Sequence, residues 1–172
     1  YSTFLTRAVD QVMYDVGLHG QPVVFALDRA GITGDDGASH HGVLDLALLS
    51  KVPGITIFAP SSAQELVVMF REALAIETGP TVIRWPKTAA RQVQPHHVGS
   101  GLAARKVRQG DGEVCILALG KLVETAEHAA AALAEQGVEA TVWDVRVAKP
   151  LDVDMLVDAA RHRLVVTAED GI

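Results

Sequence analysis

The chain has 172 residues with 15 basic and 21 acidic side chains, which give a formal net charge of −6, and 49% of its residues are apolar. This composition is that of an ordinary globular protein, and it excludes a disordered tail, a collagen-like rod and a disulfide scaffold. The acidic balance also argues against a broad nucleic-acid-binding surface, which needs clustered lysine and arginine. No apolar stretch approaches the ~20 residues of a membrane span.

Three details add to this description. The lone cysteine, Cys115, lies in an apolar run, which predicts a buried thiol and no intrachain disulfide. Asparagine is absent from the whole sequence. The first residue is Tyr1 rather than methionine and already lies in a patterned segment, so we expect the chain to be a piece of a longer protein.

In the first half, helix and strand patterns alternate. Residues 3–17 repeat apolar side chains at helical spacing, which predicts one amphipathic helix. Short continuous apolar runs predict strands buried on both faces, as in a parallel sheet. Ser62 and Glu65 match a capping box at a helix start. After the first helix, the expected elements are strands at 23–27, 55–59 and 81–85 and helices at 43–51 and 63–77.

The second half begins after a stretch rich in proline and glycine. Residues 87–112 have little apolar periodicity and predict a linker. The alternation on either side predicts an α/β fold, with a first domain of parallel sheet and flanking helices at residues 1–86 and a second α/β domain at 113–172. The expected elements of the second domain are strands at 114–119, 138–145 and 164–167 and helices at 122–136 and 150–161.

Ligands of open parallel sheets bind beyond the carboxyl ends of the strands. Two segments are expected there: Asp28-Arg29 with the glycine-rich loop of residues 30–42, and Arg84 at the end of its strand. Arginines at neighbouring strand ends can bind a phosphate or carboxylate through paired N–H donors. A loop histidine such as His40 can transfer a proton near neutral pH. These residue types predict a small anionic substrate handled by acid–base groups.

Plainer interpretations exist for several of these residues. A Gly-Asp-Asp-Gly segment is most often only a turn. The adjacent His40 and His41 rarely face one metal ion and have no third ligand spaced nearby, so no metal site is predicted. His96 and His97 lie in the linker and are expected to be solvated. Arg7, taken alone, would be assigned to the solvated face of its helix.

Six short segments form a recognisable set: YSTFLTRA at 1–8, DQ at 10–11, DRAG at 28–31, GDDGASHHG at 34–42, IFAPS at 57–61 and RWP at 84–86. Together they resemble the transketolase-like thiamine diphosphate enzymes. The His-His-Gly ending at residues 40–42 is similar to one branch of that family, the synthases that act on pyruvate and a triose phosphate, and differs from the transketolases themselves. Residues 113–172 resemble the family's C-terminal domain only in general pattern.

The resemblance implies a fold and a reaction. Residues 1–86 would be a pyrimidine-binding domain, incomplete at its N-terminus, and residues 113–172 would be part of the transketolase C-terminal domain. The reaction would be the thiamine diphosphate-dependent condensation of pyruvate with D-glyceraldehyde 3-phosphate, with loss of carbon dioxide, to 1-deoxy-D-xylulose 5-phosphate. That product feeds isoprenoid, thiamine and pyridoxal synthesis. The family also implies a magnesium ion, a homodimer and cytoplasmic residence, with no nucleic-acid or membrane partner.

On the cofactor side, the resemblance implies roles for three residues. Phe4 matches the aromatic residue that stacks on the aminopyrimidine ring, because a flat apolar face suits a flat heterocycle. Tyr1 and Arg7 match catalytic residues near the bound pyruvate adduct.

On the acceptor side, Arg29 and Arg84 match the pair that would bind the triose phosphate group. Asp36 and His40 match catalytic residues that contact the acceptor, and His40 is the candidate for proton transfer.

Half of the family's cofactor site has no counterpart in this sequence. The family binds the diphosphate and its magnesium ion through a Gly-Asp-Gly sequence followed by an asparagine, but Gly110-Asp111-Gly112 precedes a strand of the second domain and no asparagine exists. We interpret residues 110–112 as a turn. The activating glutamate of the family is likewise expected before Tyr1. The chain by itself is therefore expected to be inactive.

Two other functions are compatible with these residues. One is another enzyme of the same family, such as a transketolase or the beta subunit of a 2-oxoacid dehydrogenase. The other is a non-catalytic α/β module whose loop only binds a partner. His40, His41 and Arg29 argue against the first. Alanine replacements of His40 or Arg29 would test the second.

Overall fold

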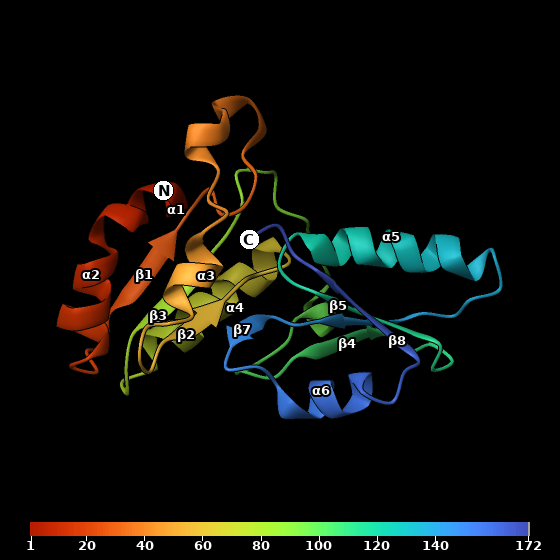
Figure 1. The fold of residues 1–172 in the computed structure, drawn as a ribbon. Helices are drawn as coiled ribbons and strands as arrows, with labels where there is room; N and C mark the ends of the chain where they lie inside the picture. Colours follow the sequence, from red (N-terminus) through yellow and green to blue (C-terminus); the bar gives the residue numbers. More distant parts are fainter. Residues whose placement is uncertain (172) are drawn as a thin grey trace.

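The short apolar runs of the sequence form two four-stranded sheets in the computed structural model, which describes residues 1–171 (Figure 1). Each sheet keeps three parallel strands and one antiparallel edge strand. In spatial order, the first sheet holds β1 (Val24–Leu27), β3 (Thr81–Arg84), β2 (Thr56–Phe58) and β7 (Val147–Lys149). The second holds β4 (Arg105–Arg108), β6 (Thr141–Asp144), β5 (Val114–Ala118) and β8 (Leu164–Ala168).

The helical segment at the N-terminus is interrupted rather than continuous. The predicted helix 3–17 consists of α1 (Ser2–Leu5), a 3-10 turn, α2 (Val9–Gln11) and a six-residue π-helix that ends at Gly17. Ala8 departs from helical backbone angles, with φ −122° and ψ 14°, and so separates the pieces. Gly17 allows close packing, because a Cβ atom there would lie 2.5 Å from Val52 Cγ1.

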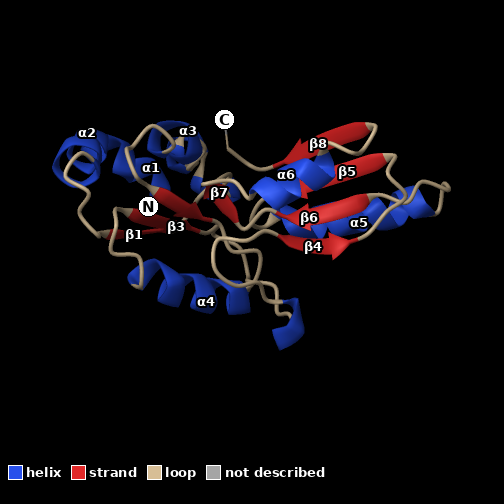
Figure 2. Cartoon of the chain, turned by 90° about the horizontal axis from the view of Figure 1, so that it is seen from below, coloured by secondary structure: helices blue, strands red, loops and turns tan. Residues whose placement is uncertain are grey.

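The first sheet is covered on both faces, as its continuous apolar strands predicted (Figure 2). Successive residues of a strand point to opposite faces, so Ile57 packs with Val12 and Leu49 while Phe58 packs with Met69 of α4. The helices that cover it are α1, α2 and α3 (Asp45–Leu49) on one face and α4 (Ala63–Leu74) on the other.

The second sheet is covered in the same way. Ile116 of β5 packs with Val123 of α5 (Leu122–Ala134), whereas its neighbour Leu117 belongs to a cluster around Met155 of α6 (Val153–Ala159). Cys115 is fully buried in β5, and burial raises the pKa of its thiol to about 11. Within residues 1–171, no helix has the length and apolar character needed to cross a bilayer.

Two strands were not predicted, and both are edge strands. β4 lies inside the expected linker and pairs antiparallel with β6; its Arg-Lys-Val-Arg sequence has no apolar run to indicate a strand. β7 comes from the second half of the sequence but pairs antiparallel with β2 of the first sheet. Backbone hydrogen bonds therefore connect the three predicted parts of the chain: β4 joins residues 87–112 to 113–172, and β7 joins residues 113–172 to 1–86.

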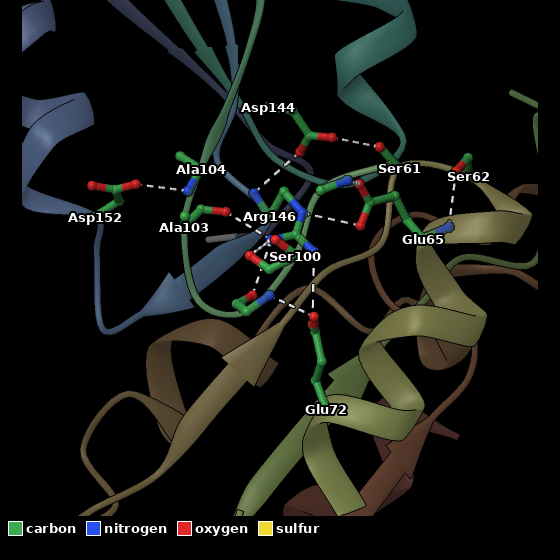
Figure 3. Close-up of polar contacts among 12 residues, drawn as sticks. Ser61, Ser62, Glu65, Glu72, Ser100, Ala103, Ala104, Asp144, Arg146 and Asp152 are labelled. Carbon is green, nitrogen blue, oxygen red and sulfur yellow. Dashed lines mark hydrogen bonds and ion pairs between the residues drawn. The ribbon is translucent and has the colours of Figure 1, made fainter. Parts of the chain in front are cut away.

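A buried arginine fixes the two sheets to each other (Figure 3). Arg146 lies between β6 and β7 with φ +58°, and its Nε donates to Glu65 of α4 at 3.0 Å. Its Nη1 donates to the carbonyl oxygens of Ser100, Gly101 and Ala103 at 2.7–3.2 Å. The connection between the sheets thus wraps around the guanidinium group.

In the capping box at the start of α4, Ser62 has its predicted partner, but the Glu65 carboxylate binds other groups. Ser62 caps α4, since its Oγ accepts from the Glu65 amide at 3.1 Å, as the capping box predicts. The Glu65 carboxylate binds Arg146 and the Gly99 amide, the latter at 2.6 Å, and makes no hydrogen bond to the Ser62 amide. This motif therefore starts the helix and also joins the two sheets.

Candidate active site

The candidate site lies at the carboxyl end of β1, where three sequence segments meet. Leu27 and Arg84 are register partners in β1 and β3, so the residues that follow them share one edge of the sheet. The N-terminal helix is attached there, because the Ser2 amide donates to the Asp28 carbonyl at 2.8 Å. The loop of residues 30–42 returns to the same place through hydrogen bonds between Gly31 and Gly42 at 2.8 and 2.9 Å.

Three aromatic rings form the open part of the site. The Tyr1 and Phe4 rings stack with centroids 5.1 Å apart and an interplanar angle of 12°. The His40 ring meets the Phe4 ring edge-on at 5.6 Å and the Tyr1 ring at 6.3 Å. Tyr1 and Phe4 are 45% and 44% exposed, so this surface is open to a ligand. Tyr1, Phe4 and His40 are hereafter the aromatic cluster.

Two arginines place positive charge beside these rings. The Arg29 guanidinium carbon lies 3.8 Å from the Tyr1 ring centroid, and that of Arg7 lies 5.7 Å from the Phe4 centroid. Arg29 has a φ of 57°, which side-chain-bearing residues rarely adopt and which is concentrated at functional sites. Cations over aromatic faces are favourable and leave N–H donors at their edges for an anion.

Carboxylates surround Arg29 and bring in a residue that sequence reasoning missed. Arg29 pairs with Asp28 and, through Nε, with Asp36 Oδ2 at 3.4 Å. Lys87 Nζ lies 2.5 Å from Asp36 Oδ1 and 3.4 Å from Asp35 Oδ1. The hydrogen bond from Lys87 is the main cause that lowers the pKa of Asp36, with the charge of Arg29 acting in the same direction. Asp36 is therefore ionised near neutral pH.

The two adjacent histidines differ in environment. His41 Nδ1 accepts from the Thr33 amide at 3.2 Å and lies 3.0 Å from Thr33 Oγ1, so His41 holds the loop together. His40 Nδ1 lies 3.0 Å from Ser39 Oγ, and its ring belongs to the aromatic cluster. Of the two, His40 is the one whose ring contacts Tyr1 and Phe4.

Arg84 lies at the predicted strand end but is enclosed. Its side chain is 3% exposed, and its Nε donates to buried Asp45 Oδ2 at 2.8 Å. Its Nη2 lies 3.6 Å from Asp170 Oδ1, in the segment after β8. Asp45 had a weak sequence signal, an acidic residue in the first turn of a helix, whereas Asp170 had none. The structure thus places Arg29 in the open cluster and Arg84 in a buried ion pair.

The aromatic cluster has the chemistry to bind one end of thiamine diphosphate. Phe4 is half-exposed and stacks on the Tyr1 ring, and an aromatic surface of this kind suits a flat aminopyrimidine ring. Over residues 1–171, no group of three or more His, Cys, Asp or Glu side chains could hold a metal ion. Asp111 fills a turn, where its Oδ1 accepts from the Glu113 amide at 3.0 Å, as interpreted from the sequence. The residues present therefore fit the pyrimidine end of the cofactor.

Comparisons with known proteins agree with this arrangement. Residues 1–92 match the family described as the transketolase pyrimidine binding domain, and residues 103–172 match the transketolase C-terminal domain. The chain therefore belongs to the transketolase family.

Among curated proteins, the chain is similar to two 1-deoxy-D-xylulose-5-phosphate synthases. It is 45% identical to that of Thermobifida fusca and 46% identical to that of Mycobacteroides abscessus, in each case over 99% of this chain. These matches cover 28% and 27% of the relatives, so the chain spans just over a quarter of their length.

Solved structures show the same fold. A split-gene transketolase, described as an inactive beta4 tetramer, is 30% identical with a TM-score of 0.88 over 99% of this chain and 56% of its own. A Pichia stipitis transketolase mutant is 20% identical with a TM-score of 0.82, covering 98% of this chain and 26% of its own, which supports the fold alone.

Proposed function

We propose that the protein containing this chain catalyses the thiamine diphosphate-dependent condensation of pyruvate with D-glyceraldehyde 3-phosphate to 1-deoxy-D-xylulose 5-phosphate. Identity of 45–46% to synthases of that name, over 99% of the chain, supports the assignment. The observation that carries it is the aromatic cluster, in which the His40 ring lies 5.6 Å from Phe4 with Arg29 over Tyr1. A stacking face for the cofactor, a proton-transfer group and an anion-binding group would thus share one surface.

On the cofactor side, Phe4 would stack on the aminopyrimidine ring, and Tyr1 supports Phe4 from the opposite face. When bound, thiamine diphosphate accepts the electron pair released as pyruvate loses carbon dioxide. Arg7, beside the Phe4 ring, would attract the pyruvate carboxylate.

On the acceptor side, Arg29 and Arg84 would bind the phosphate of D-glyceraldehyde 3-phosphate. Asp36 would accept a hydrogen bond from an acceptor hydroxyl, because Lys87 and Arg29 keep its carboxylate ionised. His40 would donate a proton to the aldehyde oxygen as the new carbon–carbon bond forms. Its Nδ1 is beside Ser39 Oγ, so the proton would pass from Nε2.

Further parts of the proposal rest on the family resemblance. Ligands of the magnesium ion and the diphosphate would come from outside this chain, because the chain lacks asparagine and residues 110–112 form a turn. The isolated chain would accordingly be inactive. The domains would divide at residues 1–86 and 113–172 around the connection 87–112. The complete enzyme would be a cytoplasmic homodimer.

Product analysis on the full-length protein tests the reaction. With pyruvate and D-glyceraldehyde 3-phosphate we expect carbon dioxide and 1-deoxy-D-xylulose 5-phosphate in equal amounts. Exclusive ketol transfer from a ketose phosphate would instead indicate a transketolase. His40→Ala should lower turnover roughly a hundredfold or more, whereas His96→Ala, in the connecting segment, should leave it unchanged. Near-normal turnover of His40→Ala would favour a loop that only binds a partner.

A further inference from the structure

Arg84 lies between two carboxylates, one that is hydrogen-bonded to it and one that is farther away. Asp45 is the first residue of α3, on the sheet that contains Arg84. Its carboxylate accepts a hydrogen bond from Arg84 Nε at 2.8 Å, and the residue is itself buried. Asp170 comes from the end of the second sheet, and its Oδ1 lies 3.6 Å from Arg84 Nη2, too far for a good hydrogen bond. Asp45 therefore fixes the guanidinium, while Asp170 supplies charge with little directional bonding.

The Nη2 atom of Arg84 is an open donor, as is Nη2 of Arg146. It is shielded from solvent and has no hydrogen-bond partner among residues 1–171. Buried polar nitrogen atoms in folded proteins almost always have such a partner. A donor left open in this way, on a guanidinium already oriented by Asp45, is prepared to bind an oxygen atom of an anion.

Asp170 has contacts of its own that do not depend on Arg84. Its Oδ2 lies 2.7 Å from Lys121 Nζ, just before α5. It also rests against the base of the loop that carries Asp36 and His40, since a Cβ atom on Gly31 would lie 1.7 Å from Asp170 Oδ2. If Asp170 moved away from Arg84, its charge would still be compensated by Lys121.

From these contacts we infer that Asp170 is a displaceable counter-ion, which occupies the anion position on Arg84 until the phosphate of the acceptor replaces it. The inference rests on the proposed function in assigning Arg84 to that phosphate. Asp170 neutralises Arg84 in the free protein and turns toward Lys121 when the phosphate binds. Because a resident carboxylate competes with an incoming anion, Asp170 weakens phosphate binding and makes Arg84 selective for an anion of higher charge than its own.

The test compares phosphorylated and unphosphorylated acceptors in the full-length protein. Asp170→Asn removes the competing charge at constant size, so KM for D-glyceraldehyde 3-phosphate should fall roughly tenfold while KM for D-glyceraldehyde stays constant. Lys121→Met removes the alternative partner of Asp170, so KM for the phosphorylated acceptor should rise about threefold. The control is Glu113→Gln, which removes an exposed carboxylate whose ion-pair partner within residues 1–171 is the exposed Arg163.

A binding measurement separates this inference from the proposed reaction. Inorganic phosphate, titrated calorimetrically into full-length protein, should bind Asp170→Asn more tightly than the wild type, whether or not the predicted product forms. Equal or weaker phosphate binding by Asp170→Asn would overturn the inference, as would equal changes in KM for both acceptors. If Asp170→Asn fails to fold, an unchanged or lower KM in Lys121→Met would overturn it. If Asp170→Asn binds phosphate more tightly, as expected, but the predicted product does not form, the proposed reaction alone is refuted.

Discussion

Arg146 and Glu65 form an ion pair in which neither side chain reaches solvent, although Glu65 lies in α4 and Arg146 connects the two sheets (Figure 3). The pair is completed by backbone groups of the connecting segment, since Arg146 donates to three carbonyl oxygens and Glu65 accepts from the Gly99 amide. These additional hydrogen bonds offset part of the cost of burying the two charges, but removing one partner leaves an uncompensated charge in the interior.

Replacing Arg146 should therefore destabilise the protein strongly. Arg146→Met leaves Glu65 buried without its partner, and we expect the free energy of unfolding to fall by about 3–5 kcal/mol in urea denaturation. Arg163→Met breaks an exposed pair with Glu113 and should cost at most about 1 kcal/mol. Equal losses in the two variants would contradict the role of Arg146.

Asp144 should make stability depend on pH. Burial raises the pKa of its carboxyl group to about 6, although Ser61 Oγ donates to it at 2.6 Å. Between the unfolded value near 3.8 and about 6, the folded state binds more protons, so this group lowers stability as pH rises. Relative to that of Asp144→Asn, the free energy of unfolding of the wild type should fall by about 2 kcal/mol between pH 4 and pH 7 in urea denaturation.

Asp154→Asn, at an exposed position of α6, is the matched control for this titration. It should leave the pH dependence of unfolding unchanged. A constant difference in stability between wild type and Asp144→Asn at every pH would show that Asp144 does not titrate in this range.

Lys87 should set the acidic limit of activity through Asp36. Lys87→Met removes the hydrogen bond that chiefly lowers the pKa of Asp36, so its carboxylate should take up a proton at higher pH. In the full-length protein, the acidic limb of the pH–rate profile should shift to higher pH. Lys51→Met, an exposed lysine, should leave the profile in place, and a Lys87→Met profile that overlays the wild type would exclude this role for Lys87.

Gly31 should tolerate alanine less well than Gly34 does. Both have positive φ, +76° and +68°, so both substitutions carry a backbone penalty of about 1–2 kcal/mol. Only at Gly31 would the new Cβ collide, 1.7 Å from Asp170 Oδ2, whereas Gly34 has open space. Thermal unfolding should show a larger loss of stability for Gly31→Ala, and an Asp170→Ala background, which removes all three colliding carboxyl atoms, should remove the excess. An excess that persisted there would place the collision elsewhere.

Local patterns in the sequence predicted most of the elements and the segments of the site. Continuous apolar runs indicated the buried parallel strands, because such strands need apolar side chains on both faces. The site segments were found because residues 28–42 form one contiguous loop whose glycines and histidines are distinctive. The edge strands β4 and β7 were missed, because neither has an apolar run that stands apart from its neighbours.

The sequence by itself determined the fold class and the family, and it named Tyr1, Phe4 and His40 as candidate site residues. The contacts among their three rings are visible only in the tertiary structure. Only the tertiary structure decided that Arg84 is enclosed by Asp45 and Asp170, and that Arg146 joins the sheets by binding a residue 81 positions away. Periodicity and motifs report on neighbours along the chain, whereas the partner of a buried charge depends on which strands become adjacent and which side chains their packing excludes from water.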